Sequence, residues 1–305
     1  EKGENIMSYQ VPFKQVDVFT TVPFMGNPVA VVLNGDGLTT GQMQAIANWT
    51  NLSETTFVCA PSDPQADYRL RIFTPRSELP FAGHPTIGSA FAMLEHGMKP
   101  KTPGRIVQEC GRGLVPIYIY EDKLFFELPE PNLMSTQSVD VAELANALKI
   151  DKSEIKASAT VDVGVVWIIL QLSGADEVVN LHPEMAKLAA LTPSGAAGVT
   201  VFGLYDDNHE IDIEVRSFAP CEGIDEDPVC GSGNGCVAAF VKELGIIKKP
   251  GYVAGQGRCL GRNGRVEIRF EDSGKILVGR SAVTCIEGTI RTSNMIESQP
   301  KHGTA

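Results

Sequence analysis

The sequence of 305 residues lacks the features that mark several large classes of protein. It has no apolar run near the roughly 20 residues that a membrane-spanning helix needs. Its first ten residues, EKGENIMSYQ, are charged and lack the apolar stretch of a secretory signal peptide. It also has no block of lysine and arginine, and its net charge of -11 with a pI near 5.0 argues against a nucleic-acid surface. We therefore expect a cytoplasmic protein without a membrane or nucleic-acid partner.

Cysteine pairs are also lacking. The seven cysteines are an odd number, and no two of them form a CxxC motif. This favours reduced thiols over a disulfide framework or a zinc site. The remaining composition, 43% hydrophobic and 21% charged, is typical of a globular protein whose length allows one large domain or two ordinary ones.

The chain contains an internal repeat. The segment FVCAPSDPQADYRLRIFTP (57–75) aligns without a gap over FGLYDDNHEIDIEVRSFAP (202–220), at an offset of 145 residues. Each copy has an apolar run, a polar turn and an alternating run, which predicts a β-hairpin. The identical pairs are Phe57 and Phe202, Asp67 and Asp212, Arg71 and Arg216, Phe73 and Phe218, and Pro75 and Pro220.

After a three-residue insertion, the match resumes at an offset of 148 residues. GHPTIGSAFAMLEHG (83–97) aligns over GSGNGCVAAFVKELG (231–245). Each copy predicts a helix that begins in a glycine-rich loop and ends at a glycine, with Pro85 suited to the first helical position. The expected apolar stripes are Ile87, Phe91 and Leu94 in the first helix, and Cys236, Phe240 and Leu244 in the second.

The repeat predicts two similar halves of α/β (α+β) class. The first half is expected over residues 11–135, with Glu54 and His84, and the second over 136–292, with Asp227 and the glycine-rich loop. An alternative is that the last strands pack back on the first half. A linking helix is expected within VDVAELANALKI (139–150), and a polar, frayed tail over 293–305.

The two helix entries are candidates for binding a small acid. The first turn of a helix offers unpaired N–H groups and the positive end of the helix dipole, and glycines let an anion approach the backbone. Two facing entries would hold a substrate carboxylate between the halves. The alternative is that the glycines only form turns and that His84 and Ser232 are N-caps. Each copy alone favours that alternative, but the repetition favours a ligand.

Two carboxylates are candidates for the chemistry. Asp227 leads directly into the second helix entry, where a carboxylate is unfavourable unless it binds a donor group or shares a proton. We therefore interpret it as orienting a substrate amine or hydroxyl, although three acids in a row usually indicate solvent exposure. Glu54 stands before the repeated hairpin, and its counterpart in the alignment is Val199. One acid on a duplicated scaffold suits proton transfer by a single base, although a glutamate before a strand is most often solvated.

Four segments together resemble the PhzF-like isomerase family of phenazine-biosynthesis-like proteins. They occur in the family order over about residues 11–291. The resemblance implies a diaminopimelate-epimerase-like fold, in which each half is a sheet curled around a central helix. The segments are DVFTTVPFMGNPVAVVL (17–33), NLSETTFV (51–58), RIFTPRSELPFAGHPTIGSA (71–90) and FAPCEGIDEDPVCGSGNG (218–235).

The resemblance also implies roles for the candidate residues. Glu54 would be the general acid/base, and His84 and Asp227 would contact and orient a small carboxylate substrate. The backbones of Gly83, Gly231 and Ser232 would hold its carboxylate. The family needs no metal or organic cofactor, and its members are commonly homodimers. The expected activity is a cofactor-independent isomerisation that moves a proton and shifts a double bond.

Related two-thiol racemases carry a cysteine in each loop. Here Ala82 occupies the first thiol position and Cys230 the second. A racemase or epimerase of an amino or hydroxy acid that uses Cys230 is therefore one alternative, while a buried structural thiol is the simpler interpretation of Cys230. A second alternative is a non-catalytic module that binds a small acid or a protein. Nucleotide binding through GSGNG is disfavoured, because IDEDPVC rather than a buried apolar strand precedes it.

Overall fold

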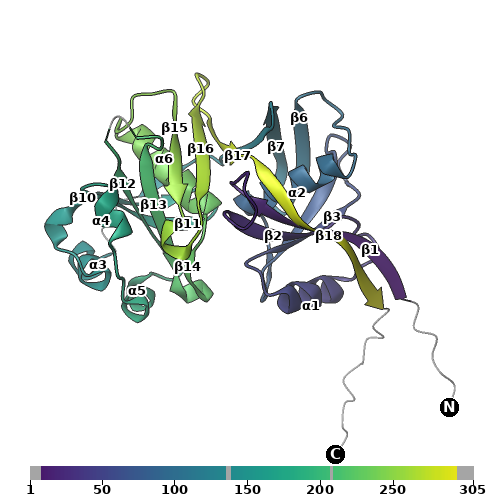
Figure 1. The fold of residues 1–305 in the computed structure, drawn as a ribbon, viewed down its shortest axis with the longest axis horizontal. Helices are drawn as coiled ribbons and strands as arrows, with labels where there is room; N and C mark the ends of the chain where they lie inside the picture. Colours follow the sequence, from purple (N-terminus) through teal and green to yellow (C-terminus); the bar gives the residue numbers. More distant parts are fainter. Residues whose placement is uncertain (1–7, 135–138, 207–208, 294–305) are drawn as a thin grey trace, which may run out of the picture.

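The computed structural model describes residues 8–134, 139–206 and 209–293. Its ribbon forms two lobes side by side, each with a helix enclosed by a curved sheet (Figure 1). The expected boundary between 135 and 136, and all of the expected tail after Ser293, lie outside the described residues. No helix in the described part of the chain combines the length and the apolar character needed to cross a membrane.

The first lobe curls around α2 (Gly83–Glu95). Its strands follow the order β1-β2-β3-β4-β6-β7-β8, and β5 pairs only with the end of β4. The β2–β3 and β4–β6 pairs are parallel and the others are antiparallel. The elements are β1 Ser8–Val18, β2 Asn27–Val32, α1 Thr40–Thr50, β3 Thr55–Cys59, β4 Tyr68–Phe73, β5 Glu78–Leu79, β6 Arg105–Cys110, β7 Gly113–Tyr120 and β8 Lys123–Glu127.

The second lobe repeats this topology around α6 (Gly231–Glu243). Its order is β10-β11-β12-β13-β15-β16-β17, again with two parallel pairs and with a short strand, β14, on β13. The expected linking helix is α3. The elements are β9 Asn132–Met134, α3 Val141–Leu148, η2 Lys152–Glu154, β10 Ile155–Asp162, β11 Val166–Leu172, α4 Ala175–Val179, α5 Met185–Leu191, β12 Ala196–Leu204, β13 Ile213–Ala219, η3 Pro220–Glu222, β14 Ile224–Asp227, β15 Gly251–Gln256, η4 Arg258–Leu260, β16 Gly264–Phe270 and β17 Ile276–Arg280.

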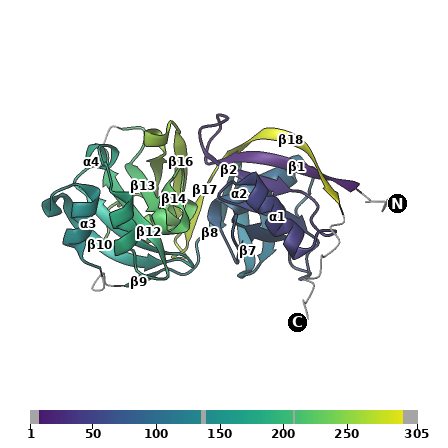
Figure 2. The ribbon, with the colours of Figure 1, turned by 90° about the horizontal axis from the view of Figure 1, so that it is seen from below.

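Three strand pairs define how the lobes join. β8 of the first lobe pairs antiparallel with its counterpart β17, so one continuous sheet runs through both lobes. β9 pairs with β10 and so belongs to the second lobe, although it precedes residue 136. The last strand, β18 (Ala282–Ser293), returns to the first lobe and pairs along β1, as the yellow and purple ribbons show in Figure 2.

The central helices are buried because their sequences are small and apolar on nearly every face. All residues of α2 from Gly83 to Ala90 are buried, and α6 is buried from Gly233 to Val241. Both helices end as expected before a glycine with positive φ, Gly97 and Gly245. Two details of the expectation are wrong: Pro85 is the third helical residue rather than the first, and Leu244 is 53% exposed.

The repeated hairpins differ by one residue in register. Thr55 pairs with Phe73 in the first lobe, whereas Val199 pairs with Phe218 in the second. The offset is therefore 145 residues along the second strand but 144 along the first. A strand alternates its faces, so the slip also explains why Phe57 packs outward against α1 while Phe202 packs inward against α6. The structural counterpart of Glu54 is thus Gly198, not Val199, and it too carries no acid.

An ion pair is duplicated along with the fold. Arg71 of β4 binds both carboxylate oxygens of Glu78 in β5, and Arg216 of β13 binds both of Glu226 in β14. Each guanidinium also lies over a phenylalanine ring of its own strand. Glu226 is therefore buried and paired, and in the run Asp225, Glu226 and Asp227 only Asp225 is exposed.

Candidate active site

The two helix entries meet at the junction of the lobes. A Cβ atom added to Gly231 at the start of α6 would lie 3.1 Å from the backbone nitrogen of His84 and 3.5 Å from the Cα atom of Gly83 in α2. The first N–H groups of a helix have no acceptor within the helix, and they point out of its N-terminal end. Since α2 and α6 both begin here, the N–H groups of both first turns point toward this region. Their positive dipole ends therefore add at one place.

Neither His84 nor Ser232 is an N-cap. The N-cap of α2 is Ala82, and that of α6 is Cys230, whose Sγ accepts a hydrogen bond from the N–H of Gly233. The Oγ atom of Ser232 instead accepts from the indole nitrogen of Trp167 at 3.0 Å. The capping alternative is wrong at both positions, which leaves the imidazole of His84 available for another partner.

The side chain of Glu54 faces that imidazole. Its Oε2 lies 3.3 Å from Nε2 of His84, and the two side chains are only 15% and 6% exposed. Their relative orientation does not make a hydrogen bond, so both atoms are buried without a hydrogen-bond partner. Such atoms are rare in folded proteins, so the pair is the strongest candidate for a functional site at the junction of the lobes.

Burial sets the protonation of this pair. It raises the pKa of Glu54 to about 7, against a smaller lowering by the hydroxyl of Ser53. It lowers the pKa of His84 to about 4, against the opposing effects of the Asp227 charge and the Pro28 carbonyl. At neutral pH a neutral imidazole therefore faces a carboxyl group that is near its titration midpoint.

Asp227 approaches from the second lobe and is held by the first. Its Oδ1 accepts hydrogen bonds from the Asn27 side-chain amide and from the Val229 N–H, both at 3.0 Å. Burial raises its pKa to about 6; the His84 charge lowers the value and the Glu54 charge raises it. The mutual influence of these three groups means that they titrate as a coupled set.

Two supporting residues were not expected from the sequence. Asn27 begins β2 and is 1% exposed, and its amide also donates to the Val229 carbonyl. Gln256 of β15 donates to the Asp227 carbonyl and accepts from the Cys230 N–H and the Asn234 side chain. The sequence signal for Asn27 is a polar amide at the start of an apolar strand, but its partner Asp227 lies 200 residues away.

The thiol of Cys230 is placed for a structural role. It is buried at 3% exposure, its Sγ caps α6, and burial together with the Asp227 charge raises its pKa well above the usual value. A thiol acts as a base or nucleophile in its thiolate form, which this environment disfavours. Within the described residues, no group of three or more His, Cys, Asp or Glu side chains is arranged to hold a metal ion.

Comparisons with known proteins identify the family to which the chain is similar. A sequence profile of the PhzC-PhzF family, described as phenazine biosynthesis-like protein, matches residues 16–288. Antisense-enhancing sequence 1 of Schizosaccharomyces pombe is 41% identical over 292 residues, which cover 90% of this chain and 97% of that protein. An uncharacterized isomerase of Clostridium acetobutylicum is 30% identical over 275 residues, covering 83% of this chain and 88% of its own.

Solved structures share the fold at lower identity. A PhzF-family phenazine biosynthesis protein of Bacillus anthracis has a TM-score of 0.81 at 24% identity, covering 92% of this chain and 99% of its own. A hydroxyproline epimerase of Agrobacterium vitis has a TM-score of 0.60 at 14% identity, covering 94% and 93%. Both the α/β class and the diaminopimelate-epimerase-like architecture predicted from the sequence are thereby confirmed.

Proposed function

Because the chain belongs to the PhzC-PhzF family of phenazine biosynthesis-like proteins, we propose that it is a cofactor-independent isomerase in which Glu54 moves a proton between two carbon atoms of a small carboxylic acid. The observation that carries this proposal is the buried approach of Glu54 to His84, in which neither facing atom has a hydrogen bond. A base that both removes and returns a proton needs a pKa near the working pH, and the pKa of Glu54 is about 7.

The reaction needs only a proton and the electrons of the substrate. The Glu54 carboxylate takes a proton from a carbon atom beside a double bond, and the C–H electron pair is delocalised over the double bond and the substrate carboxyl group. Glu54 then gives a proton to a second carbon atom, and this proton can exchange with solvent while it is on the carboxyl group. The double bond shifts, and the composition of the molecule is unchanged.

The helix entries supply the electrostatic support. The substrate carboxylate would lie at the N–H groups of Gly83, Gly231 and Ser232, where two helix dipoles stabilise the negative charge that grows during proton removal. The neutral imidazole of His84 and the carboxyl group of Asp227 would contact the substrate and keep the transferred proton facing Glu54. Binding would bring donors to the polar atoms that are unpaired in the described structure.

The alternative that uses Cys230 has less support. Its thiol caps a helix and has a raised pKa, and the opposite loop offers Ala82 rather than a second thiol. The non-catalytic alternative does not account for a carboxyl group with a pKa near 7 beside an imidazole whose Nε2 atom is buried without a hydrogen-bond partner. Assembly as a homodimer stays a prediction, which sedimentation analysis at several protein concentrations would check.

Proton exchange in deuterated water tests the proposal. Wild-type protein is incubated with a panel of small unsaturated and amino-substituted acids, and proton NMR follows both isomerisation and deuterium incorporation. We expect Glu54→Gln to lower both rates by about 100- to 10,000-fold, the range of general acid–base catalysis. Equal rates in the variant and the wild type would rule out Glu54 as the base.

A further inference from the structure

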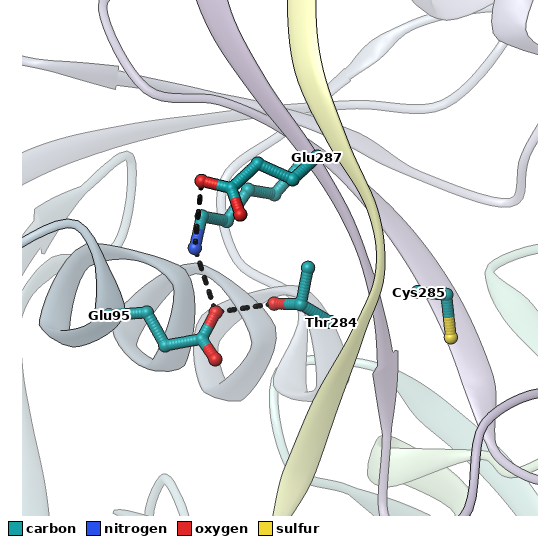
Figure 3. A pocket seen from close by; sticks show the side chains of 5 residues that line it. Glu95, Thr284, Cys285 and Glu287 are labelled. Atoms are coloured by element: carbon teal, nitrogen blue, oxygen red, sulfur yellow. Dashed lines mark hydrogen bonds and ion pairs between the residues drawn. The ribbon is translucent and has the colours of Figure 1, made fainter.

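The strand β18 carries a bulge at Cys285, and this residue lines two neighbouring cavities. Gln15 of β1 pairs with Ile286 and Val16 pairs with Thr284, so Cys285 between them has no partner in β1. A bulge inserts one residue and re-aims the side chains on either side of it. In Figure 3, Cys285 lies on the other side of the yellow strand from Glu95 and Thr284.

The larger cavity, about 460 Å³, contains charged side chains that are already paired with one another. The ammonium of Lys14, 4% exposed, lies 2.8 Å from Glu95 and 3.7 Å from Glu287. Thr284 donates a further hydrogen bond to Glu95 (Figure 3). These contacts pair the polar side chains of the larger cavity with one another. None of these side chains has a buried polar atom without a partner, so nothing in the cavity indicates a ligand.

The smaller cavity, about 280 Å³, presents opposite charges that do not meet. It is lined by Asp17 of β1 in the first lobe and by Arg262 of the second lobe. Asp17 is 2% exposed; its Oδ2 accepts from the Gly26 N–H, while its Oδ1 is buried without a hydrogen-bond partner. In the described part of the chain these two side chains form no ion pair within 4.0 Å. Burial raises the pKa of Asp17, and the Gly26 N–H, the Arg262 charge and the Met25 and Phe24 N–H groups oppose that rise.

The guanidinium of Arg262 is fixed at the cavity by the opposite lobe. Its Nη1 donates to the carbonyls of Phe24 and Gly26 at 3.1 and 3.4 Å. The remaining surface of the cavity is mostly apolar, and Gln15 and Cys285 complete the lining. The apolar lining residues are Val16, Phe24, Pro28 and Ile286.

We propose that this cavity is a second binding site, separate from the Glu54–His84 site, and that it takes a small zwitterion of the α-amino acid type. The ammonium would donate to the unpaired Oδ1 of Asp17, and the carboxylate would face the guanidinium of Arg262. An apolar side chain would contact the apolar lining. A molecule with both charges matches the two unmet ones, whereas a simple amine or a simple acid leaves one of them unpaired in a buried place.

The site is linked to the catalytic residues through a short segment. Asp17 pairs with Pro28 across β1 and β2, and the Pro28 carbonyl faces the imidazole of His84. Asn27, the residue between Gly26 and Pro28, holds Asp227. A ligand between Asp17 and Arg262 would therefore stabilise one arrangement of this segment. The proposal concerns binding alone and does not depend on the proposed function.

The thiol of Cys285 offers a reporter of occupancy. It is partly exposed and lines both cavities, and its alkylation by iodoacetamide can be followed by peptide mass spectrometry. Because Arg262 lines only the smaller cavity, a substitution of Arg262 assigns any protection to that cavity. Cys221, an exposed thiol that does not line the cavity, serves as the internal control. We expect L-valine to slow alkylation of Cys285 several-fold with saturating concentration dependence, without an effect on Cys221. Isobutylamine and isobutyrate at the same concentrations should protect far less.

Variants show whether L-valine protects Cys285 by binding between Asp17 and Arg262 or by an effect elsewhere on the protein. Arg262→Gln should abolish the protection, while Arg258→Gln, which alters a nearby exposed arginine outside the cavity lining, should retain it. Asp17→Asn should also abolish it, and the Arg262 variant decides alone if Asp17→Asn does not fold. Absence of protection in the wild type, equal protection by isobutylamine or isobutyrate, or retained protection in Arg262→Gln would each overturn the proposal.

Discussion

The Oε2 atom of Glu54 lies 3.3 Å from the Nε2 atom of His84, and burial moves the pKa values of the two groups in opposite directions, to about 7 and about 4. Each shift favours the uncharged form. The pair is therefore not a salt bridge at neutral pH but a carboxyl group near its midpoint beside a neutral imidazole. This arrangement places a proton acceptor in a buried site, which lowers the stability of the folded protein. That loss of stability can be measured without a substrate.

We predict that Glu54→Gln stabilises the protein at pH 8 but not at pH 4. The folded-state pKa of Glu54, about 7, lies above its unfolded value, so the folded state binds more protons between about pH 4.5 and 7 and this group makes stability fall as pH rises. Above pH 7 the buried charge costs about 1–3 kcal/mol, which the amide avoids. Urea unfolding at both pH values measures the difference.

A matched control separates the pH-dependent stabilisation by Glu54→Gln from the stabilisation that loss of any negative charge would give. Glu130→Gln replaces an exposed glutamate and should change the free energy of unfolding little at either pH. A Glu54→Gln variant that is less stable than the wild type at pH 8 would mean that the Glu54 carboxylate has a stabilising partner, contrary to its environment in the structure.

The helix entries could be predicted from the sequence, whereas the residues that support them could not. Repetition of a glycine-rich entry and a terminal glycine indicated α2 and α6, because only a few residue types fit those backbone positions. The one-residue slip of β12 was hidden, because an apolar strand that is buried on both faces looks alike in either register. The start of helix α1 has a signal in the sequence itself, the capping box of Thr39 and Gln42.

We predict that Asn27→Ala lowers kcat/KM by about 10- to 100-fold, the range expected for loss of a hydrogen bond to a charged group. The Asn27 amide donates to both Asp227 and the Val229 carbonyl, and so sets the position of Asp227 across the lobe boundary. Steady-state kinetics with the substrate found in the exchange screen measures the loss. Asn48→Ala removes an exposed amide whose partner is the Pro75 carbonyl and should leave kcat/KM within a few-fold.

Asn27→Asp distinguishes positioning from packing. A carboxyl group at this position can donate to Asp227 only while it is protonated, because two adjacent carboxylates repel each other. The activity of the variant relative to the wild type should therefore rise as the pH falls from 8 to 6. A constant ratio over this range would show that the Asn27 side chain acts through packing alone.

We predict that Cys230→Ser retains activity within about 10-fold of the wild type. Serine is among the preferred N-cap residues and can accept from the Gly233 N–H, as Sγ does now. Since Cys230 has a pKa well above the usual range, the substitution removes no thiolate at neutral pH. Steady-state kinetics of the variant measures the retained activity. The rate at which the wild-type Cys230 thiol is alkylated measures how little thiolate it forms. Complete loss of activity in a folded variant would instead favour a racemase or epimerase that uses Cys230.

The duplicated ion pair gives a prediction with its own internal control. The side chains of Arg216 and Glu226 are each 7% exposed, whereas Arg71 and Glu78 are 18% and 39% exposed. Glu226→Gln should lower the free energy of unfolding by about 3–5 kcal/mol, because it leaves a buried guanidinium without its counter-charge. Glu78→Gln, at the equivalent position, should cost about 0–1 kcal/mol. Urea unfolding of the two variants compares them directly. Equal costs would mean that burial does not set the strength of these pairs, and that the Val178 and Leu181 carbonyls, which also accept from Arg216, compensate its charge.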